Sequence, residues 1–442
     1  MKKILSLVLA LCLTLGMASF AAAEEALPTF DQLVYGENAD ITASIVFAYH
    51  RTDIPEKLNG YVDEFRKTYP NVTIEYDLIT DYAENALNRV KTADWTIMGI
   101  PAVDKDELSG FFVPLGATDT LSEKYAFMDA WNFDGVTYGM PSTGNAQGIV
   151  YNKAVFAKAG VTEIPKTPDE FIAALKAIKA NTDAIPLYTN YAANWTMGAW
   201  DAYIGGSATG DANYMNNVLL HKANPFSDNG DGTGPYAVYK ILYDAVKEGL
   251  IEEDYTTTDW EGCKGMINNG QIGCMVLGSW AFTQMRDAGE HGDDIGYMSF
   301  PITVNGKQYA SAGADYSFGV NVKATYEQKL ASLYYIKFLT EQSGFAYSEG
   351  GLPIDKTGEY PALYEAFNGI EFVADAPAAE GEEALFNELN AESELAINAG
   401  GNTKIQKIIE HAFNGDKEFD DIMAEWNEAW TAAQEALNVE IR

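Results

Sequence analysis

A tryptophan at the start of a predicted helix is the strongest candidate for a ligand contact in this sequence. Trp280 follows Gly278 and Ser279, and these three residues come directly after a strand predicted over 272–277. An indole ring in such a place offers a flat apolar face at low entropic cost, which suits stacking on a ligand. The alternative is that Trp280 lies in the hydrophobic core.

A second group of aromatic residues follows the strand predicted over 185–189. Its members are Tyr188, Tyr191, Trp195 and Trp200. Ligands of α/β sheets bind beyond the carboxyl ends of strands, so at least one of these rings is expected to contact a ligand. Trp195 is the preferred candidate because it begins the next predicted helix, whereas Tyr188 is more typical of a core.

Polar side chains follow the first predicted strand, over 41–49. They are His50, Arg51 and Asp53. A carboxylate accepts two hydrogen bonds from hydroxyl groups and a guanidinium donates two, so these side chains suit a ligand rich in hydroxyls. For Asp53, ligand binding and capping of the helix that starts near Pro55 carry equal weight. For Arg51 the alternative is an ion pair with a nearby acid.

Motifs of several enzyme classes do not occur in the sequence. It contains no H-E-x-x-H, P-loop, G-x-S-x-G or G-x-G-x-x-G motif, and its four histidines are scattered. Residues 228–234 (DNGDGTG) have the composition of a calcium loop but not its spacing, so a plain turn is favoured. The sequence therefore predicts no catalytic residue, no metal site and no cofactor.

The elements that must hold the candidate residues alternate in type. From 41 to 101 the pattern is strand, helix, strand, helix, strand, as in a doubly wound α/β unit. The alternation resumes later, where Thr167, Pro168 and Glu170 form a capping box that starts a helix. Residues 374–394, rich in Ala, Glu and Gly, are predicted to form a solvated loop. The sequence thus predicts an α/β fold of two units.

The segment over 134–160 (DGVTYGMPSTGNAQGIVYNKAVFAKAG) links these two units. It combines a turn at its start, a short strand over 149–151 and a helix that ends at Gly160. Between the turn and the strand, Gly144 and Asn145 are small or polar, as a hinge requires.

This linking segment resembles that of the extracellular solute-binding proteins of ATP-driven importers, the sugar-binding family that includes maltose-binding protein. In that family a G-x-x-Y-G-x-P segment leads through a hinge into a Y-N-K-x-x-F-x-K-A-G strand and helix. Every one of these positions is matched here, by Gly135, Tyr138, Gly139, Pro141, Tyr151, Asn152, Lys153, Phe156, Lys158, Ala159 and Gly160. The family is also similar in its order of helix, strand, small residue and tryptophan.

The resemblance implies two lobes, joined by hinge strands, that close on a ligand and deliver it to a membrane permease. The expected N-terminal lobe comprises 41–142 and 311–345, after a lead-in over 24–40, and the expected C-terminal lobe comprises 143–310 and 346–442. A ligand that makes more contacts in the closed form shifts the population toward closure. The implied ligand is a carbohydrate, expected to be an oligosaccharide because aromatic residues are plentiful, and the protein is expected to be a monomer.

The resemblance also assigns residues to the site. It implies that Trp280 stacks on a sugar ring. Asn145 would contact the ligand as the lobes close. Asp315 and Tyr316, which precede a strand that returns to the first lobe, would lie at the ligand cleft.

The first residues, 1–23, have the pattern of an export signal, with two lysines, an apolar run and a small-residue cleavage site. Cleavage after Ala23 would place the mature chain outside the cytoplasm, in the periplasm or at the cell surface. The formal charge of −35 would then become about −37, which disfavours nucleic acid as a partner. Cys263 and Cys274 would remain, as a disulfide or, as favoured here, as two buried free thiols.

Two other functions stay open on the sequence alone. A secreted glycoside hydrolase needs only two carboxyl groups about 5–9 Å apart, and release of reducing sugar would identify it. A binding protein for a peptide or an organic cation is the second alternative, because aromatic cages also hold cations. Binding that survives high salt would count against a cation.

Overall fold

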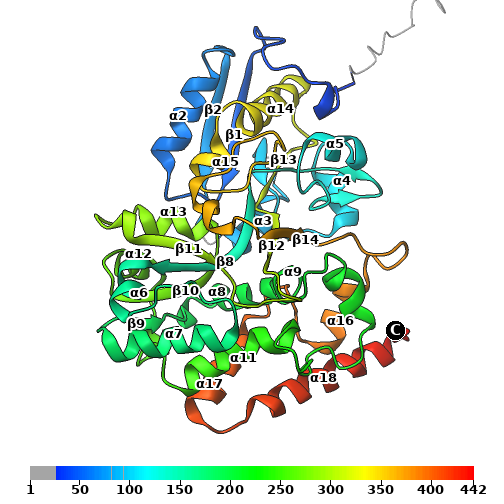
Figure 1. The fold of residues 1–442 in the computed structure, drawn as a ribbon. Helices are drawn as coiled ribbons and strands as arrows, with labels where there is room; N and C mark the ends of the chain where they lie inside the picture. Colours follow the sequence, from blue (N-terminus) through cyan, green and yellow to red (C-terminus); the bar gives the residue numbers. More distant parts are fainter. Residues whose placement is uncertain (1–25, 81, 93) are drawn as a thin grey trace, which may run out of the picture. The chain divides into compact units, whose positions relative to one another are not determined.

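The computed structural model describes residues 26–442 except Asp81 and Ala93 (Figure 1). The predicted export signal and its cleavage site lie outside the described residues. The chain divides into two compact units. Unit 1 ends at Gly116 and takes in Gly319–Phe338 as well, and unit 2 comprises Ala117–Phe318 and Leu339–Arg442. Helices and strands occur in both units, and the predicted α/β fold class is confirmed.

Unit 1 is built on strands in the order β2-β1-β3-β13, with β1 parallel to both of its neighbours. The first long helix of unit 1, α2, buries a stripe of side chains that includes Leu58, Val62 and Phe65, at the spacing expected of a helix. The elements are η1 (Phe30–Gln32), β1 (Ala43–Tyr49), α2 (Pro55–Phe65), β2 (Val72–Leu78), α3 (Tyr82–Arg89), β3 (Ile97–Gly99), η2 (Lys105–Glu107), α4 (Leu108–Phe111), the end of β13 (Ser317–Val320), and α14 (Tyr326–Glu341) up to Phe338.

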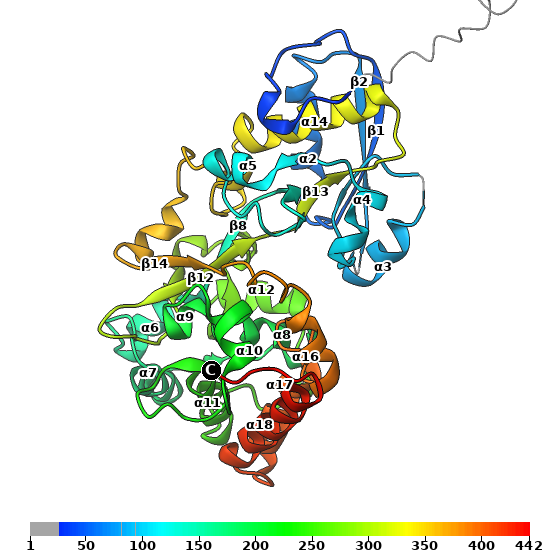
Figure 2. The same cartoon turned by 90° about the vertical axis from the view of Figure 1, so that its right-hand side faces the viewer.

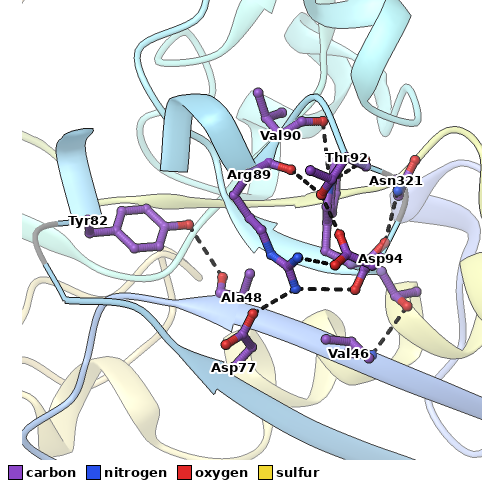
Figure 3. A network of polar contacts seen from close by, with 11 residues as sticks. Val46, Ala48, Asp77, Tyr82, Arg89, Val90, Thr92, Asp94 and Asn321 are labelled. Carbon is purple, nitrogen blue, oxygen red and sulfur yellow. Dashed lines mark hydrogen bonds and ion pairs between the residues drawn. The ribbon is translucent and has the colours of Figure 1, made fainter. Parts of the chain in front are cut away.

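A polar network fixes the loop that precedes β3 in unit 1 (Figure 3). Arg89, the last residue of α3, pairs through Nη2 with Asp77 Oδ2 at 2.7 Å and also pairs with Asp94. Asn321 donates from Nδ2 to the carbonyl oxygen of Trp95 at 2.9 Å. Trp95 itself is buried, so it belongs to the core of unit 1.

Unit 2 holds the remaining elements. They are α5 (Thr118–Lys124), β5 (Asn132–Phe133), β6 (Val136–Thr137), β7 (Met140–Pro141), β8 (Gly144–Asn152), α6 (Lys153–Ala159), α7 (Pro168–Asn181), β9 (Ile185–Leu187), η3 (Tyr191–Ala193), α8 (Trp195–Gly198), η4 (Ala199–Tyr203), α9 (Gly206–Thr209), η5 (Tyr214–Val218), α10 (Leu219–His221), α11 (Gly234–Lys247), η6 (Tyr255–Thr257), α12 (Trp260–Asn268), β10 (Ile272–Gly278), α13 (Trp280–Arg286), η7 (Gly292–Asp294), β11 (Ile295–Ser299), β12 (Tyr309–Ala314), α15 (Phe345–Ser348), η8 (Ala362–Phe367), β14 (Glu371–Ala374), α16 (Leu385–Ser393), α17 (Asn402–Asn414) and α18 (Phe419–Ala436). The two-residue strand β4 (Gly116–Ala117) spans the boundary between the units.

Strand β8 organises the main sheet of unit 2, in the order β14-β12-β8-β10-β9 with β11 also paired to β8. It is antiparallel to β10, β11 and β12. Because β12 pairs with its first residues, β8 is longer than the strand predicted over 149–151 and includes Gly144 and Asn145. Asp315 and Tyr316 form the connection between β12 and β13, as the sequence predicts for a loop.

The prediction of a solvated loop over 374–394 is wrong in its second half, which forms helix α16. Leu389 is fully buried there, and the side chain of Asn390 bonds the backbone of Ile397 through both its amide nitrogen (2.9 Å) and its oxygen (2.7 Å). Burial of Leu389 and the hydrogen bonds of Asn390 to the segment just after the helix therefore stabilise a helix whose composition is that of a loop. Figure 2 shows α16 with α17 and α18 in the C-terminal part of unit 2.

Cys263 and Cys274 are free and buried, as favoured from the sequence. Cys263 lies in α12, and burial raises the pKa of its thiol to about 12. Within the part of the chain that the structure describes, no helix has both the length and the apolar character needed to cross a membrane.

Candidate functional site

Three tryptophan rings of unit 2 contact one another and form what we call the tryptophan cluster. The ring centroids lie 5.0 Å apart for Trp195 and Trp260, 5.6 Å for Trp195 and Trp280, and 5.7 Å for Trp260 and Trp280. Trp195 is 47% exposed, and the other two rings are partly buried. Each of the three is the first residue of a helix, in α8, α12 and α13. The cluster therefore presents aromatic surface to solvent next to the ends of β9 and β10.

Gly278 provides the space that the indole of Trp280 occupies. A Cβ atom on Gly278 would lie 2.6 Å from Nε1 and 2.8 Å from Cδ1 of that indole. Any other residue would therefore displace the ring, so this glycine sets the position of Trp280.

Ser279 attaches the start of α13 to strand β8. Its N–H donates to the carbonyl oxygen of Ala146 at 2.9 Å, and its Oγ accepts from the Ala146 N–H at 3.1 Å. The same hydroxyl donates to Oδ1 of Asn145 at 3.3 Å. Asn145 in turn donates from Nδ2 to Oδ2 of Asp315 at 3.1 Å. The structure thus brings Asn145 and Asp315 together with Ser279, the residue that precedes Trp280 in the chain.

Tyr316 lies beside this network. Its N–H donates to Oδ1 of Asp315 at 2.7 Å, and its carbonyl oxygen accepts from the Ser142 N–H at 3.0 Å. Burial, with a smaller effect of the Asp315 charge, raises the pKa of the Tyr316 hydroxyl above its ordinary value. At neutral pH the hydroxyl is a donor as well as an acceptor.

The three candidates of unit 1 are held by local contacts. Arg51 and Asp53 form a two-pronged ion pair, with Nε to Oδ1 at 2.8 Å and Nη2 to Oδ2 at 2.9 Å. The helix-capping alternative for Asp53 is wrong, because the cap residue of α2 is Ile54 and the carboxylate is engaged by the guanidinium. His50 packs edge-to-face on Tyr49, at 4.5 Å between centroids. Contact of these residues with a ligand stays a prediction.

Of the aromatic residues after β9, Trp195 is the one that is largely exposed. Trp200 and Tyr188 are buried, and the Tyr188 hydroxyl accepts from the Asp259 N–H at 2.8 Å. Tyr191 is partly buried and donates its hydroxyl to Glu410 at 2.6 Å. Tyr188 and Trp200 therefore belong to the core.

The sequence analysis did not name Trp260 as a candidate. Asp259 caps that helix by accepting from the Glu261 N–H at 3.1 Å, so the ring follows a cap residue. A sequence signal for Trp260 was present, because it is the first residue of a helix, as Trp195 and Trp280 are.

The arrangement combines flat apolar faces with amide, hydroxyl and carboxylate groups. Such a surface stacks on the C–H face of a sugar ring and hydrogen-bonds its hydroxyls. Among the described residues there is no group of three or more His, Cys, Asp or Glu placed to hold a metal ion. At the former calcium-loop candidate, Asp228 and Asp231 accept from the backbone N–H groups of Gly230 and Thr233, as turns do.

Comparison with known proteins places the chain in a family. A family model described as bacterial extracellular solute-binding protein matches residues 50–344. Among solved structures, the manno-oligosaccharide-specific solute-binding protein BlMnBP2 of Bifidobacterium animalis subsp. lactis, in complex with mannotriose, is 47% identical with a TM-score of 0.90. The match covers 93% of this chain and 100% of that chain.

Two further relatives agree with this. BlMnBP1 of the same organism, a binding protein of an ABC transporter in complex with mannobiose, is 48% identical with a TM-score of 0.89, over 93% of this chain and 100% of that chain. The multiple sugar-binding protein of Streptococcus mutans is 22% identical over 330 residues, which are 71% of this chain and 76% of that protein.

The match over residues 50–344 covers more than half of the sequence, so the chain belongs to the bacterial extracellular solute-binding proteins. The resemblance seen at 134–160 is thereby confirmed. The predicted class of function, a carbohydrate-binding solute-binding protein of an ABC transporter, is confirmed with it.

Proposed function

We propose that this protein captures a manno-oligosaccharide outside the cytoplasm, as a monomer, and delivers it to the permease of an ABC importer. The observation that carries the proposal is the tryptophan cluster, held in place by Gly278 and by the Ser279–Asn145–Asp315 network. Support for this class of sugar comes from two relatives, 47% and 48% identical, that are described in complex with mannotriose and mannobiose.

In the proposed complex, Trp280 and Trp195 stack on sugar rings through their exposed faces. Asp315 accepts hydrogen bonds from sugar hydroxyls, and Asn145 holds this carboxylate in its orientation through the 3.1 Å hydrogen bond. A neutral sugar can satisfy such groups without bringing a charge into the site.

The proposal is binding without catalysis, as in the relatives. A reducing-sugar assay on manno-oligosaccharides incubated with the protein is expected to show no increase over buffer. Release of reducing sugar would favour the glycoside hydrolase instead.

A thermal-shift screen of residues 24–442 tests the ligand class. The panel would hold mannobiose, mannotriose, raffinose, chitin oligosaccharides, peptides and polyamines. Ligand at a hundred times its Kd stabilises a protein by about 2.7 kcal/mol, which is a readable rise in Tm. The largest rise is expected with the manno-oligosaccharides, and a rise only with peptides or polyamines would contradict the proposal.

A further inference from the structure

We infer that the carbohydrate surface continues from the tryptophan cluster onto a second aromatic cluster, and that the ligand is therefore longer than a trisaccharide. The second cluster consists of Tyr191, Tyr255 and Phe413. This inference rests on the proposed function and adds the length of the ligand to it.

The rings of the second cluster meet edge to face, as Trp195 and Trp260 do in the first. Tyr191 and Tyr255 lie 4.7 Å apart between centroids at an interplanar angle of 68°, and Tyr255 and Phe413 lie 5.0 Å apart at 73°. Phe413, near the end of α17, is 50% exposed. Phenylalanine side chains are more often buried. Tyr191 is fixed by the hydrogen bond to Glu410. The second cluster thus ends at Phe413, whose ring is accessible to solvent.

Two neighbouring segments of unit 2 connect the clusters. One runs from η3 into α8, and the other runs from η6 into α12. Three contacts join them in order: the Tyr191–Tyr255 ring contact, the hydrogen bond from the Ala192 N–H to Thr258 Oγ1 at 2.7 Å, and the Trp195–Trp260 ring contact.

The distance between the clusters is short along the segment from η3 into α8. Four chain steps separate Tyr191 from Trp195, so their Cα atoms lie at most about 14 Å apart. This is the length of a few sugar units. Rings that stack on Trp195 and rings that stack on Tyr255 can therefore belong to one oligosaccharide.

The chemistry of the rim favours a sugar over a protein partner. Asp254 and Glu410 lie at the edge of the second cluster, and both carboxylates already accept hydrogen bonds from hydroxyls, those of Thr256 and Tyr191. The aromatic rings can stack on the apolar faces of a sugar chain, and the carboxylates beside them can accept hydrogen bonds from its hydroxyls. A protein interface would need a wider apolar area.

Calorimetric titration with manno-oligosaccharides of two, three and five units tests the inference. The wild-type protein is expected to bind the five-unit ligand about threefold to tenfold more tightly than the three-unit ligand, the gain of an added aromatic contact. Phe413→Ala is expected to remove this gain and to leave binding of the two-unit ligand unchanged. Tyr360→Ala, at an aromatic residue that is 53% exposed outside both clusters, is the matched control and should keep the gain.

The outcomes separate this inference from the proposed function. Equal affinity of the wild-type protein for three and five units, or an equal loss for every length in Phe413→Ala, would overturn the inference alone. No binding of any manno-oligosaccharide by the wild-type protein would overturn the proposed function and the inference with it. An unchanged Tm of Phe413→Ala would exclude misfolding as the cause of a loss.

Discussion

The side-chain amide of Asn145 donates from Nδ2 to Oδ2 of Asp315 at 3.1 Å, and its Oδ1 accepts from the hydroxyl of Ser279 at 3.3 Å. One side chain on β8 thereby connects the residue that follows β12 to the residue that opens α13. Asparagine is suited to this place because it is donor and acceptor at once. The position of Trp280 relative to Asp315 depends on that amide.

Replacing this amide by a carboxylate tests the connection. Asn145→Asp would set two carboxylates about 3 Å apart, and these would repel each other. It would also remove the hydrogen bond from Asn145 to the Asp315 carboxylate, and a hydrogen bond to a charged group contributes about 1.5–3 kcal/mol. A fall in Tm of several degrees is expected at pH 7. The control is Asn305→Asp, the same change at an exposed turn residue. Equal Tm values for the two variants would contradict the account.

Sugar binding is expected to depend both on the presence of the Trp280 ring and on its position. Trp280→Ala should weaken sugar binding by at least about thirtyfold, the effect of a dominant aromatic contact. Gly278→Ala keeps every tryptophan but pushes the indole from its place, since the new Cβ would lie 2.6 Å from Nε1, so it should also weaken binding. Gly265→Ala, where an added Cβ meets nothing within 4 Å, is the matched glycine control. Wild-type affinity in Gly278→Ala would show that Trp280 does not contact the ligand.

A buried ion pair joins η4 to α17 in unit 2. Asp201 is fully buried and pairs with Lys404 while accepting from the Tyr239 hydroxyl at 2.7 Å. Removing one member of a buried pair costs about 3–5 kcal/mol, so Lys404→Met is expected to lower Tm by many degrees. Lys247→Met breaks an exposed pair with Glu418 and should leave Tm unchanged. Similar Tm values for the two variants in differential scanning calorimetry would contradict this.

The buried side chain of Glu252 is expected to make stability depend on pH. Glu252 accepts from the Thr189 N–H at 3.0 Å, yet burial outweighs its hydrogen bonds and raises its pKa above the ordinary value of about 4.3. Because the folded pKa is the higher one, the stability that this group contributes is complete below the unfolded pKa and is lost as the pH rises through the folded pKa.

Glu252→Gln keeps this side chain neutral at every pH and tests the sign. Its Tm relative to wild type is expected to be lowest near pH 4 and to rise as the pH increases through the folded pKa of Glu252. Glu253→Gln, at the exposed neighbouring residue, should show no such trend. A constant difference between Glu252→Gln and wild type across this range would refute the assignment.

Signals that depend on a few neighbouring residues predicted the structure well. Thr167 caps α7 by accepting from the Glu170 N–H at 3.3 Å, and Gly160 ends α6 with a φ of 83°, as their sequence patterns indicate. Trp195 and Trp280 stand where predicted, at the first residues of helices that follow strands. For Thr167 and Gly160 the determining contacts lie within one turn of the chain.

What the sequence did not predict depends on contacts between distant segments. Gly144 and Asn145 have the composition of a flexible hinge, but they pair with Ala314 and Gly313 and so extend β8. Trp260 joins the tryptophan cluster only because α12 and α8 meet in space. No periodicity within either segment encodes that meeting.

Calorimetric titration of mannotriose into the mature protein, with Trp280→Ala measured beside it, tests the central claim most directly. We expect saturable binding by the wild-type protein and a loss of at least about thirtyfold in the variant, with Tm unchanged. No heat of binding with mannotriose, or equal affinity in the two proteins, would contradict the claim that the tryptophan cluster binds a manno-oligosaccharide.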